Sequence, residues 1–433
     1  MHLNDDRTRR TLKFSILDGA FASAMTGLTQ DYFAPFLLLL GATSKHIGML
    51  TALPNLFASI LQANSADFAQ KLQSRRKVVN LFVLLHAFML LPMVLIALMT
   101  KSSPYIFIAI VTAFTSLVAI ANPAWASVMS DLVPQQKRGS YFGWRNKMLG
   151  FVTVIFAFIA GLILNVTKGV NVFYGFAVIF SAAFIFRMIS WYFLTKMHEP
   201  HLEYKKEYYF NLFDFISRMH ESNFARFVIF VSLMNFSVNF GSPFITVLML
   251  RDLHFSYMLY TTITIASTFT IFLMMARWGN IADRVGNLKI IKFTSVFIAI
   301  IPLLWIVNRH PAYLIFIQIF AGFMWAGFNL CTTNFIYDAV TPEKRTRCIS
   351  YFNMFNGMAI CAGALAGGFM VSRLPPLFGY KILTLLLISF FLRITIGLFV
   401  PFKLKEVRPV KAIKNNDLFF SVIGIKPIIQ DYE

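Results

Sequence analysis

The chain has 433 residues, of which 58% are hydrophobic and only 13% are charged, whereas an ordinary soluble domain has roughly 25% charged residues. A soluble core cannot hide so large a hydrophobic fraction, which excludes a soluble enzyme, a disordered chain and a secreted disulfide scaffold. The net charge of +20 would suggest nucleic acid if the protein were soluble. In a membrane protein the same excess is typical of basic cytoplasmic loops, so we expect no nucleic-acid partner.

Apolar segments recur along the chain, and each is close to the roughly 20 residues that a membrane-spanning helix needs. The segments do not alternate with the period of two that a transmembrane β-barrel requires. We expect spans at 13–40, 46–66, 78–99, 104–129, 142–165, 171–195, 225–250, 257–277, 289–308, 311–337, 347–372 and 378–401. The expected fold class is therefore an all-α polytopic membrane protein with 12 transmembrane helices.

The distribution of Lys and Arg predicts the orientation in the membrane. An even number of spans places both termini on one side, and that side carries about four Lys or Arg for each one on the other. Both termini are therefore expected in the cytoplasm. Arg187 and Arg393 lie within the sixth and twelfth spans, and we expect their long side chains to reach back to the inner interface.

The two halves of the chain resemble each other at an offset of about 207 residues, the kind of internal repeat that marks a duplicated architecture. The matching pairs are Asp31 with Asn239, Asn122 with Asn329, Asp131 with Asp338, Lys137 with Lys344, and Arg187 with Arg393. Because six spans are an even number, the two six-helix halves have the same orientation. Parallel halves of this kind are one transporter plan, with the substrate site between them.

The repeat predicts four parts of the chain. Residues 1–195 form an N-terminal six-helix bundle, and residues 225–401 form a C-terminal one. Residues 196–224 are expected to be a cytoplasmic linker with an interfacial amphipathic helix, because aromatic and aliphatic residues fall near one helical face there. Residues 402–433 form a cytoplasmic tail.

The segment after the eighth span resembles the loop motif of the major facilitator superfamily, Gly-x-x-x-Asp-Arg/Lys-x-Gly followed by basic residues. Its residues are Gly279, Asp283, Arg284, Gly286 and Lys289. The copy after the second span keeps Asp67 and a basic cluster but has lost both glycines. The segment 130–146 is similar to a bacterial branch of this family. The resemblance implies a multi-pass protein of the bacterial inner membrane and the family's fold of two pseudo-symmetric bundles.

The resemblance also implies a gate, in which the loop motif locks one conformation closed on the cytoplasmic side. Gly279 and Gly286 are expected to permit tight backbone turns. Asp131 and Asp338, beside the basic pairs that contain Arg138 and Arg345, are the expected opposing charges.

Helices 1, 4, 7 and 10 line the cavity in this family. The expected cavity residues on them are Gln30, Asn122, Trp125, Asn235, Asn239, Gln318, Trp325 and Asn329. Asp31 is expected to be the only carboxylate well inside a helix, whereas Asp18 should reach water or Lys13. A charged side chain inside the membrane is energetically costly, and two explanations for Asp31 remain open. It carries a proton or pairs with a cation in the cavity, or it makes a packing hydrogen bond to a neighbouring helix.

The function expected from the resemblance is secondary transport of a small solute by alternating access, with proton coupling. No Gly-x-x-x-x-Gly-Lys-Ser/Thr motif is present, so ATP is not the expected energy source. One alternative is a transporter-fold sensor or scaffold without transport. Another is an intramembrane enzyme, but the sequence lacks the cluster of His, Asp and Glu that such an enzyme would need. The three cysteines lack metal-ligand spacing, so neither a metal nor a cofactor is expected. The expected partners are the solute and the lipid bilayer, with the protein acting as a monomer.

Overall fold

The computed structural model describes residues 6–133, 138–199, 222–340, 342–399 and 404–407. The expected amphipathic helix of the linker and most of the expected tail lie outside the described residues. Elsewhere the chain is a bundle of long helices, with no strand in the described ranges.

Helices of the first half follow the expected spans closely, although the first and third spans are each divided. They are α1 (Asp6–Thr29), η1 (Gln30–Tyr32), α2 (Phe33–Leu39), α3 (Ser44–Ala63), α4 (Ser65–Leu72), α5 (Arg75–Phe88), α6 (Leu90–Met99), α7 (Pro104–Leu132), α8 (Arg138–Thr167) and α9 (Val172–Thr195). The short helix α4 replaces what was expected to be loop.

The second half repeats this order, and its first span is again divided. Its helices are α11 (Asn223–Gly241), η3 (Ser242–Phe244), α12 (Ile245–Val247), η4 (Leu248–Asp252), α13 (Tyr257–Val285), α14 (Asn287–Val307), α15 (Pro311–Ala339), α16 (Pro342–Met370) and α17 (Lys381–Phe399). Each break is accompanied by a proline of the sequence repeat: Pro35 lies at the start of α2, just after η1, and Pro243 lies within η3.

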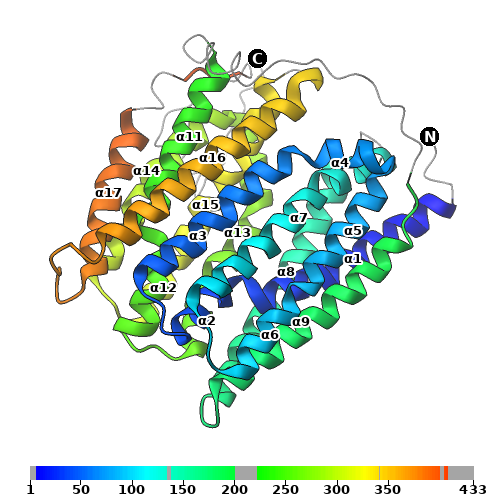
Figure 1. Ribbon diagram of the computed structural model, residues 1–433. Helices are drawn as coiled ribbons and strands as arrows, with labels where there is room; N and C mark the ends of the chain where they lie inside the picture. Colours follow the sequence, from blue (N-terminus) through cyan, green and yellow to red (C-terminus); the bar gives the residue numbers. More distant parts are fainter. Residues whose placement is uncertain (1–5, 134–137, 200–221, 341, 400–403, 408–433) are drawn as a thin grey trace.

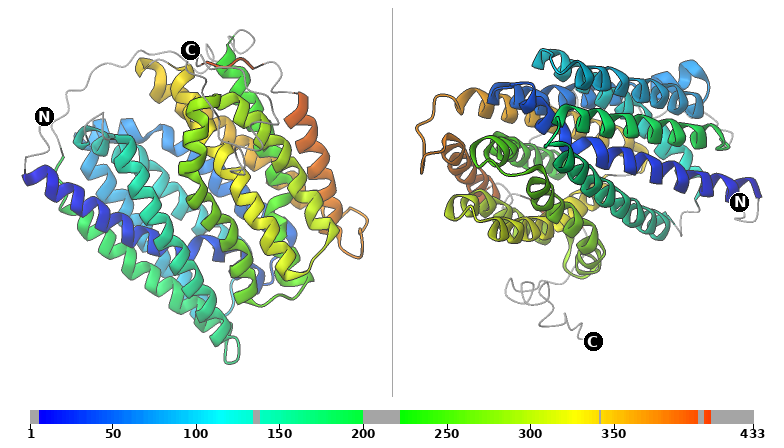
Figure 2. Two further views of the ribbon diagram at one scale, coloured as in Figure 1. Left: turned by 180° about the vertical axis from the view of Figure 1, so that it is seen from behind. Right: turned by 90° about the horizontal axis from the view of Figure 1, so that it is seen from below.

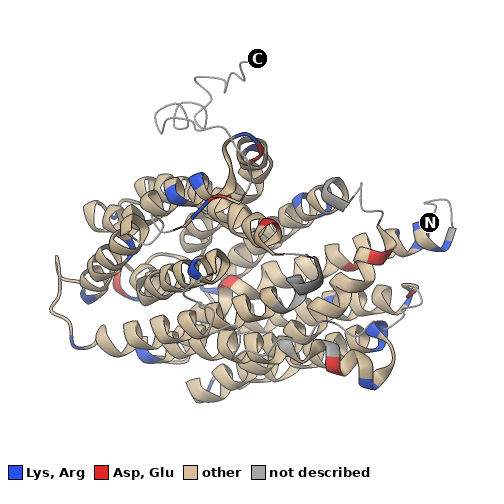
Figure 3. Ribbon diagram, turned by 90° about the horizontal axis from the view of Figure 1, so that it is seen from above, with Lys and Arg blue, Asp and Glu red and all other residues tan. Residues whose placement is uncertain are grey.

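Ten helical segments in the described ranges are long and apolar enough to cross a membrane. Neither α1 nor α3 is among them. Polar residues lower the mean hydropathy of both helices, and those of α1 include Lys13 and Asp18. Most Lys and Arg lie toward the helix ends (Figure 3), as a membrane-embedded bundle requires. The expected all-α polytopic fold is thus confirmed, and ten of the twelve expected spans meet the length and hydropathy of a membrane-crossing helix.

Side chains at the helix starts satisfy backbone N–H groups that have no partner within the helix. The Ser74 hydroxyl accepts from the Lys77 N–H, and Asn171 accepts from the Phe173 N–H. Ser222 and Ser256 do the same for α11 and α13. These caps place the beginnings of α5, α9, α11 and α13 where the hydropathy pattern places them within a few residues.

The helices pack as two groups that lie side by side (Figures 1 and 2). In the first group α1 packs on α8 and α9, and α3 packs on α7. In the second, α11 packs on α16 and α17, and α13 packs on α15. The two extensive contacts between the groups are α3 with α16 and α8 with α13. We call the end where α1 begins and α17 ends the terminal end, and the opposite end the far end.

The contact of α3 with α16 depends on small residues. A Cβ atom on Gly48 would lie 2.5 Å from the carbonyl oxygen of Ala364 and 3.3 Å from the Cα of Gly368. Because both neighbours are backbone atoms, neither can move aside as a side chain does. Glycine at this position therefore sets how closely the two halves approach near the far end.

We expect Gly48→Ala to lower the free energy of unfolding of the detergent-solubilised protein by about 1–3 kcal/mol, because the added methyl group overpacks the contact between α3 and α16. The melting temperature should fall accordingly. Gly143→Ala is the matched control, since a Cβ there meets nothing within 4 Å. The measurement is the melting temperature by intrinsic fluorescence. Equal melting temperatures for both variants would show that this contact tolerates a wider spacing.

Candidate transport site and gates

The two halves are joined at the break in the first span. The hydroxyl of Tyr32 donates to the carbonyl of Ala157 and lies 2.8 Å from the hydroxyl of Thr261 on α13. Since a tyrosine has one hydroxyl hydrogen, Thr261 is the donor in the second contact. Tyr32 is fully buried. The junction is therefore a dry hydrogen-bonded contact between α8, the first span and α13.

A second contact crosses the same junction, and Pro35 explains it. Proline has no N–H, so the carbonyl four residues earlier, that of Asp31, loses its usual helical partner. The hydroxyl of Tyr260 donates to this carbonyl at 2.8 Å. The second half thus supplies the hydrogen bond that the first span lacks.

The carboxylate of Asp31 is half-buried beside this junction. Within the described part of the chain it makes no hydrogen bond or ion pair, so the packing role has no partner there. Its repeat partner Asn239 instead donates its amide to the carbonyl of Asn235 on the same helix. The two positions share a place in the repeat but not an interaction.

The expected cavity residues differ in exposure. Gln30, Asn122 and Asn329 are exposed, whereas Trp125, Asn235, Asn239, Gln318 and Trp325 are half-buried. The amide of Asn235 donates to Asn356 on α16 at 3.2 Å, a partner that the hydropathy pattern does not single out. The guanidinium of Arg145 lies over the ring of Trp125, with Arg145 Cζ 4.6 Å from the ring centroid.

Asp18 does not reach water or Lys13, and that expectation was wrong. Asp18 is 5% exposed and accepts from the hydroxyl of Ser190 at 2.6 Å. Arg187 donates to the same hydroxyl and, through Nε, to Nδ1 of His86, both at 3.1 Å. Because α1 packs against α8 and α9, the face of α1 that carries Thr11, Ser15 and Asp18 points into the bundle. Asp31 is consequently not the only carboxylate inside a helix.

Arg187 and Arg393 do not extend to the interface either, and that expectation was also wrong. They are 5% and 2% exposed. Arg393 donates to the hydroxyls of Ser389 and Ser242 and to the carbonyls of Val238 and Ile298. Partners on neighbouring helices hold both side chains inside, which is where buried polar groups are normally satisfied.

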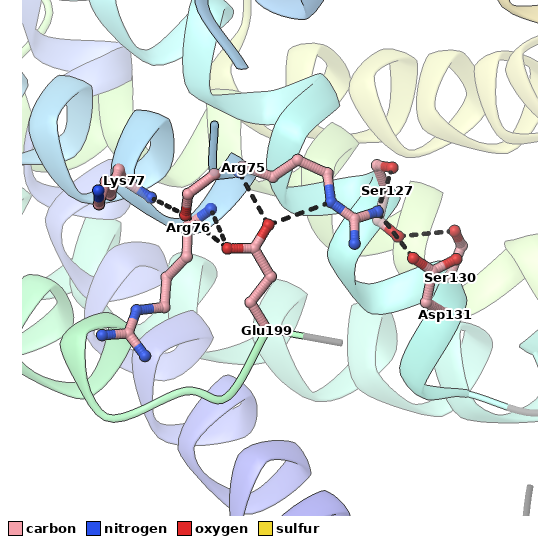
Figure 4. A network of polar contacts seen from close by, with 8 residues as sticks. Arg75, Arg76, Lys77, Ser127, Ser130, Asp131 and Glu199 are labelled. Atoms are coloured by element: carbon pink, nitrogen blue, oxygen red, sulfur yellow. Dashed lines mark hydrogen bonds and ion pairs between the residues drawn. The ribbon is translucent and has the colours of Figure 1, made fainter. Parts of the chain in front are cut away.

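At the terminal end of the first half, Arg75 joins three helices (Figure 4). Its Nη1 lies 2.7 Å from Asp131 and 2.8 Å from Ser127, both on α7. Its backbone N–H donates to Glu199, which follows α9, at 2.8 Å. The Arg75 side chain is only 4% exposed. This network ties the ends of α5, α7 and α9 together.

The second half has a related arrangement. Asn287 at the start of α14 donates to Asp338 at 2.7 Å, and the Leu288 N–H donates to Glu406, also at 2.7 Å. Glu199 and Glu406 are about 207 residues apart, as are Asp131 and Asp338. Sequence reasoning missed both glutamates, although the offset of the repeat could have identified them as a pair.

The loop-motif residues lie around the turn between α13 and α14. Gly286 has φ of +91°, a conformation that favours glycine. Gly279, in contrast, lies within α13 and forms no turn, so the expectation for this glycine was wrong. Asp67, Asp283 and Arg284 are exposed and Lys289 is half-buried. The side chains of Arg138 and Arg345 lie outside the described residues.

Burial alone would raise the pKa of Glu199, but hydrogen bonds from Ser74 and from the N–H groups of Arg75 and Arg76 outweigh it and hold that pKa below its usual value. A lowered folded-state pKa means that the carboxylate stabilises the protein above its unfolded pKa of about 4.3. This stabilisation is lost as the pH falls through the folded-state value.

We therefore expect Glu199→Gln to lower the free energy of unfolding at pH 7 by roughly 1 kcal/mol, and the difference from the parent to shrink as the pH falls from 5 to 3. The melting temperature across this range is the measurement. Asp67→Asn, which removes an exposed carboxylate on α4, is the control and should follow the parent. A deficit that stays constant down to pH 3 would exclude the charge of Glu199 as its cause.

Comparison with known proteins agrees with this architecture. Among solved structures, a point mutant of the nucleoside transporter NupG is 15% identical, with a TM-score of 0.72 over 90% of this chain and 98% of that one. The D-xylose-proton symporter is 12% identical, with a TM-score of 0.69 over 94% and 99% of the two chains. An auto-inhibited peptide transporter of the POT family is 11% identical, with a TM-score of 0.69 over 93% and 99%.

At these identities the solved structures are similar in fold alone. A comparison with curated protein sequences finds no match. The family model of the Major Facilitator Superfamily matches residues 19–220 and 227–428, which is most of the sequence. The chain therefore belongs to the Major Facilitator Superfamily.

Proposed function

We propose that this protein is a secondary transporter that moves a small solute across the membrane by alternating access, with proton coupling. The family is one of transporters, generally not of enzymes. The observation that carries the proposal is the junction at the break of the first span. It joins the halves through neutral hydroxyl contacts of Tyr32 and Tyr260, each worth about 1 kcal/mol, so that it can open and close at low cost.

Alternating access also needs two bodies that move against each other. The bodies proposed here are the bundles 1–195 and 225–401, joined by the linker 196–224 and followed by the tail 402–433. The networks of Arg75 and of Asn287 each hold the helix ends of one bundle. The loop motif around Asp283 and Gly286 is proposed to act between the bundles as the gate at the terminal end.

The substrate pathway is proposed to run between the bundles, past helices 1, 4, 7 and 10. Asn122 and Asn329 support this route, because both are exposed amides within long apolar helices. An exposed polar side chain in such a helix favours a water-filled interior over lipid. The two asparagines are also a pair in the sequence repeat, on α7 and α15.

The orientation proposed from the basic residues places both termini in the cytoplasm of a bacterial cell, with the protein acting as a monomer in the inner membrane. The terminal end would then be cytoplasmic, and the Tyr32 junction would close the outer side. Reporter fusions test this directly. Fusions at Lys101 and Lys168, in the far-end turns, should give an external signal, and fusions at Glu203 and Glu433 an internal one. An internal signal at Lys101 would reverse the orientation.

Asp31 is the residue proposed to carry the proton or to bind the substrate. Its carboxylate lies half-buried at the junction, and its carbonyl accepts from the opposite half. A change in the junction would therefore change the surroundings of the carboxylate, which is what coupling requires. The solved relatives are named for a nucleoside, a sugar with a proton, and peptides, so the fold itself selects no substrate.

We expect Asp31→Asn to abolish solute accumulation driven by a pH gradient in proteoliposomes while sparing exchange of the same solute. The neutral amide keeps the shape of the carboxylate but cannot take up and release a proton. Asp252→Asn at the far end, whose carboxylate bonds to the neighbouring Arg251, is the matched control. Loss of both accumulation and exchange would instead assign Asp31 to substrate binding, and full activity would exclude it from both roles.

The second candidate is a transporter-fold sensor or scaffold without transport. A panel of metabolites tested for uptake and efflux with an imposed pH gradient separates the two. Movement of any solute that requires the protein supports transport. No movement of any solute in either direction, from protein that is folded and inserted, favours the sensor.

A further inference from the structure

Buried polar atoms that lack a hydrogen bond of good geometry gather at the guanidinium of Arg145 in the first half, and its own Nε is one of them. Trp125 Nε1 and Arg145 Nε have no partner among the described residues. The hydroxyls of Ser15 and Tyr141 face each other, without a hydrogen bond of good geometry. Ser15 is fully buried and Arg145 is 7% exposed. Buried polar groups are nearly always satisfied, so this concentration of poorly satisfied groups at one place needs an explanation.

These atoms come from three helices that converge on Arg145. Its Nη2 donates to the carbonyl of Ser15 on α1 at 3.0 Å. Its guanidinium lies over the ring of Trp125 on α7. Tyr141 precedes it by four residues on α8 and therefore lies on the same helix face. A Cβ on Gly19 would lie 2.5 Å from Nη2, so this glycine lets α1 approach the guanidinium.

The missing partner must be an acceptor. The guanidinium and the indole N–H can only donate, and the two hydroxyls can each donate as well. A single water molecule accepts two hydrogen bonds, whereas a carboxylate has about four acceptor positions. One of the two hydroxyls can donate to the other, which leaves three donors. Three donors exceed what a single water molecule accepts and therefore fit an anionic oxygen group better.

The charge around the cluster also favours an anion. Two buried guanidinium groups, those of Arg145 and Arg187, face one buried carboxylate, that of Asp18. Arg187 shares the Ser190 hydroxyl with that carboxylate, which leaves Arg145 the less compensated of the two. His86 accepts from Arg187 through Nδ1, so this nitrogen carries no hydrogen in the arrangement seen. One excess positive charge suits a monoanion better than a phosphate, which carries nearly two charges.

The cluster lies next to the proposed pathway. Asn122, one turn before Trp125 on α7, is exposed, and Trp125 and Tyr141 are themselves half-buried. An anion could therefore approach from the side of these two rings, whereas Arg145 remains at the bottom of the cluster. We propose that Ser15, Trp125, Tyr141 and Arg145 bind the carboxylate group of an organic monoanion, and that this anion is the transported solute. Transport of this anion rests on the proposed function, whereas its binding does not.

The test measures binding to the purified full-length protein, with lactate as the probe. Potassium lactate should raise the melting temperature above that in potassium chloride of equal ionic strength, and by more than potassium phosphate does. Arg145→Gln should lose this lactate-specific rise. Lys147→Gln, which removes an exposed cation on the same helix, should keep it. A rise that survives in Arg145→Gln, or a larger one with phosphate, would overturn the assignment.

Two further variants test the site without removing its charge. Tyr141→Phe deletes one of these donors and keeps the ring, so the ligand-free protein should melt about as the parent does. Trp125→Phe also deletes one donor but removes part of the ring under the guanidinium, so it should melt lower than the parent. Each should weaken lactate binding by about tenfold, the effect of one hydrogen bond to a charged group. Lower ligand-free stability with an unchanged lactate response would assign the cluster to structure alone.

The same measurements separate this inference from the proposed function. Lactate binding that depends on Arg145, in a protein that moves no solute, would support the site and contradict transport. Transport of neutral or cationic solutes alone, without a lactate-specific rise, would support transport and contradict the site.

Discussion

A backbone that crosses a membrane must satisfy its own hydrogen bonds. The contact between the two halves lies where the first span leaves one backbone carbonyl without a helical partner. Pro35 leaves the carbonyl of Asp31 without its helical partner, and Tyr260 of the second half supplies one. The neighbouring Tyr32 is held by Ala157 and Thr261. The defect in the first span is thus also a point of attachment, and Gly48 permits the close approach of α3 and α16 at a second contact between the bundles.

Inside the first bundle the buried charged side chains are not equally satisfied by hydrogen bonds. Asp18, Ser190, Arg187 and His86 form a connected chain of hydrogen bonds. Arg145 also faces Asp18, but among the described residues its guanidinium donates only to the Ser15 carbonyl and lies over the Trp125 ring. The equivalent region of the second bundle differs, because Arg393 is bound by two hydroxyls and two carbonyls. The halves are alike in fold but differ in how their buried charges are compensated. An anion-binding site is therefore proposed in the first bundle alone.

Hydropathy and the repeat were sufficient to predict the fold, since the length of an apolar segment depends on local sequence alone. The repeat also singled out Asp131 and Asp338. It did not reveal Arg75, because the partners of that residue lie on α7 and after α9, more than 50 positions away. The errors for Asp18, Arg187 and Arg393 have one cause. Each was judged against lipid or water, whereas neighbouring helices decide where a charged side chain in a bundle lies.

The two ends of the molecule are built from different kinds of contact. Neutral hydroxyls and close backbone approach join the halves near the far end, while the terminal end of the first half uses Arg75, Asp131 and Glu199. Dissolved ions screen charges that water can reach, and the Asp131 side chain is 37% exposed, but they have little effect on buried neutral hydrogen bonds. Ionic strength therefore acts on the Arg75 network and has little effect on the tyrosine junction, so a salt concentration that loosens the helix ends at Arg75 leaves the junction intact.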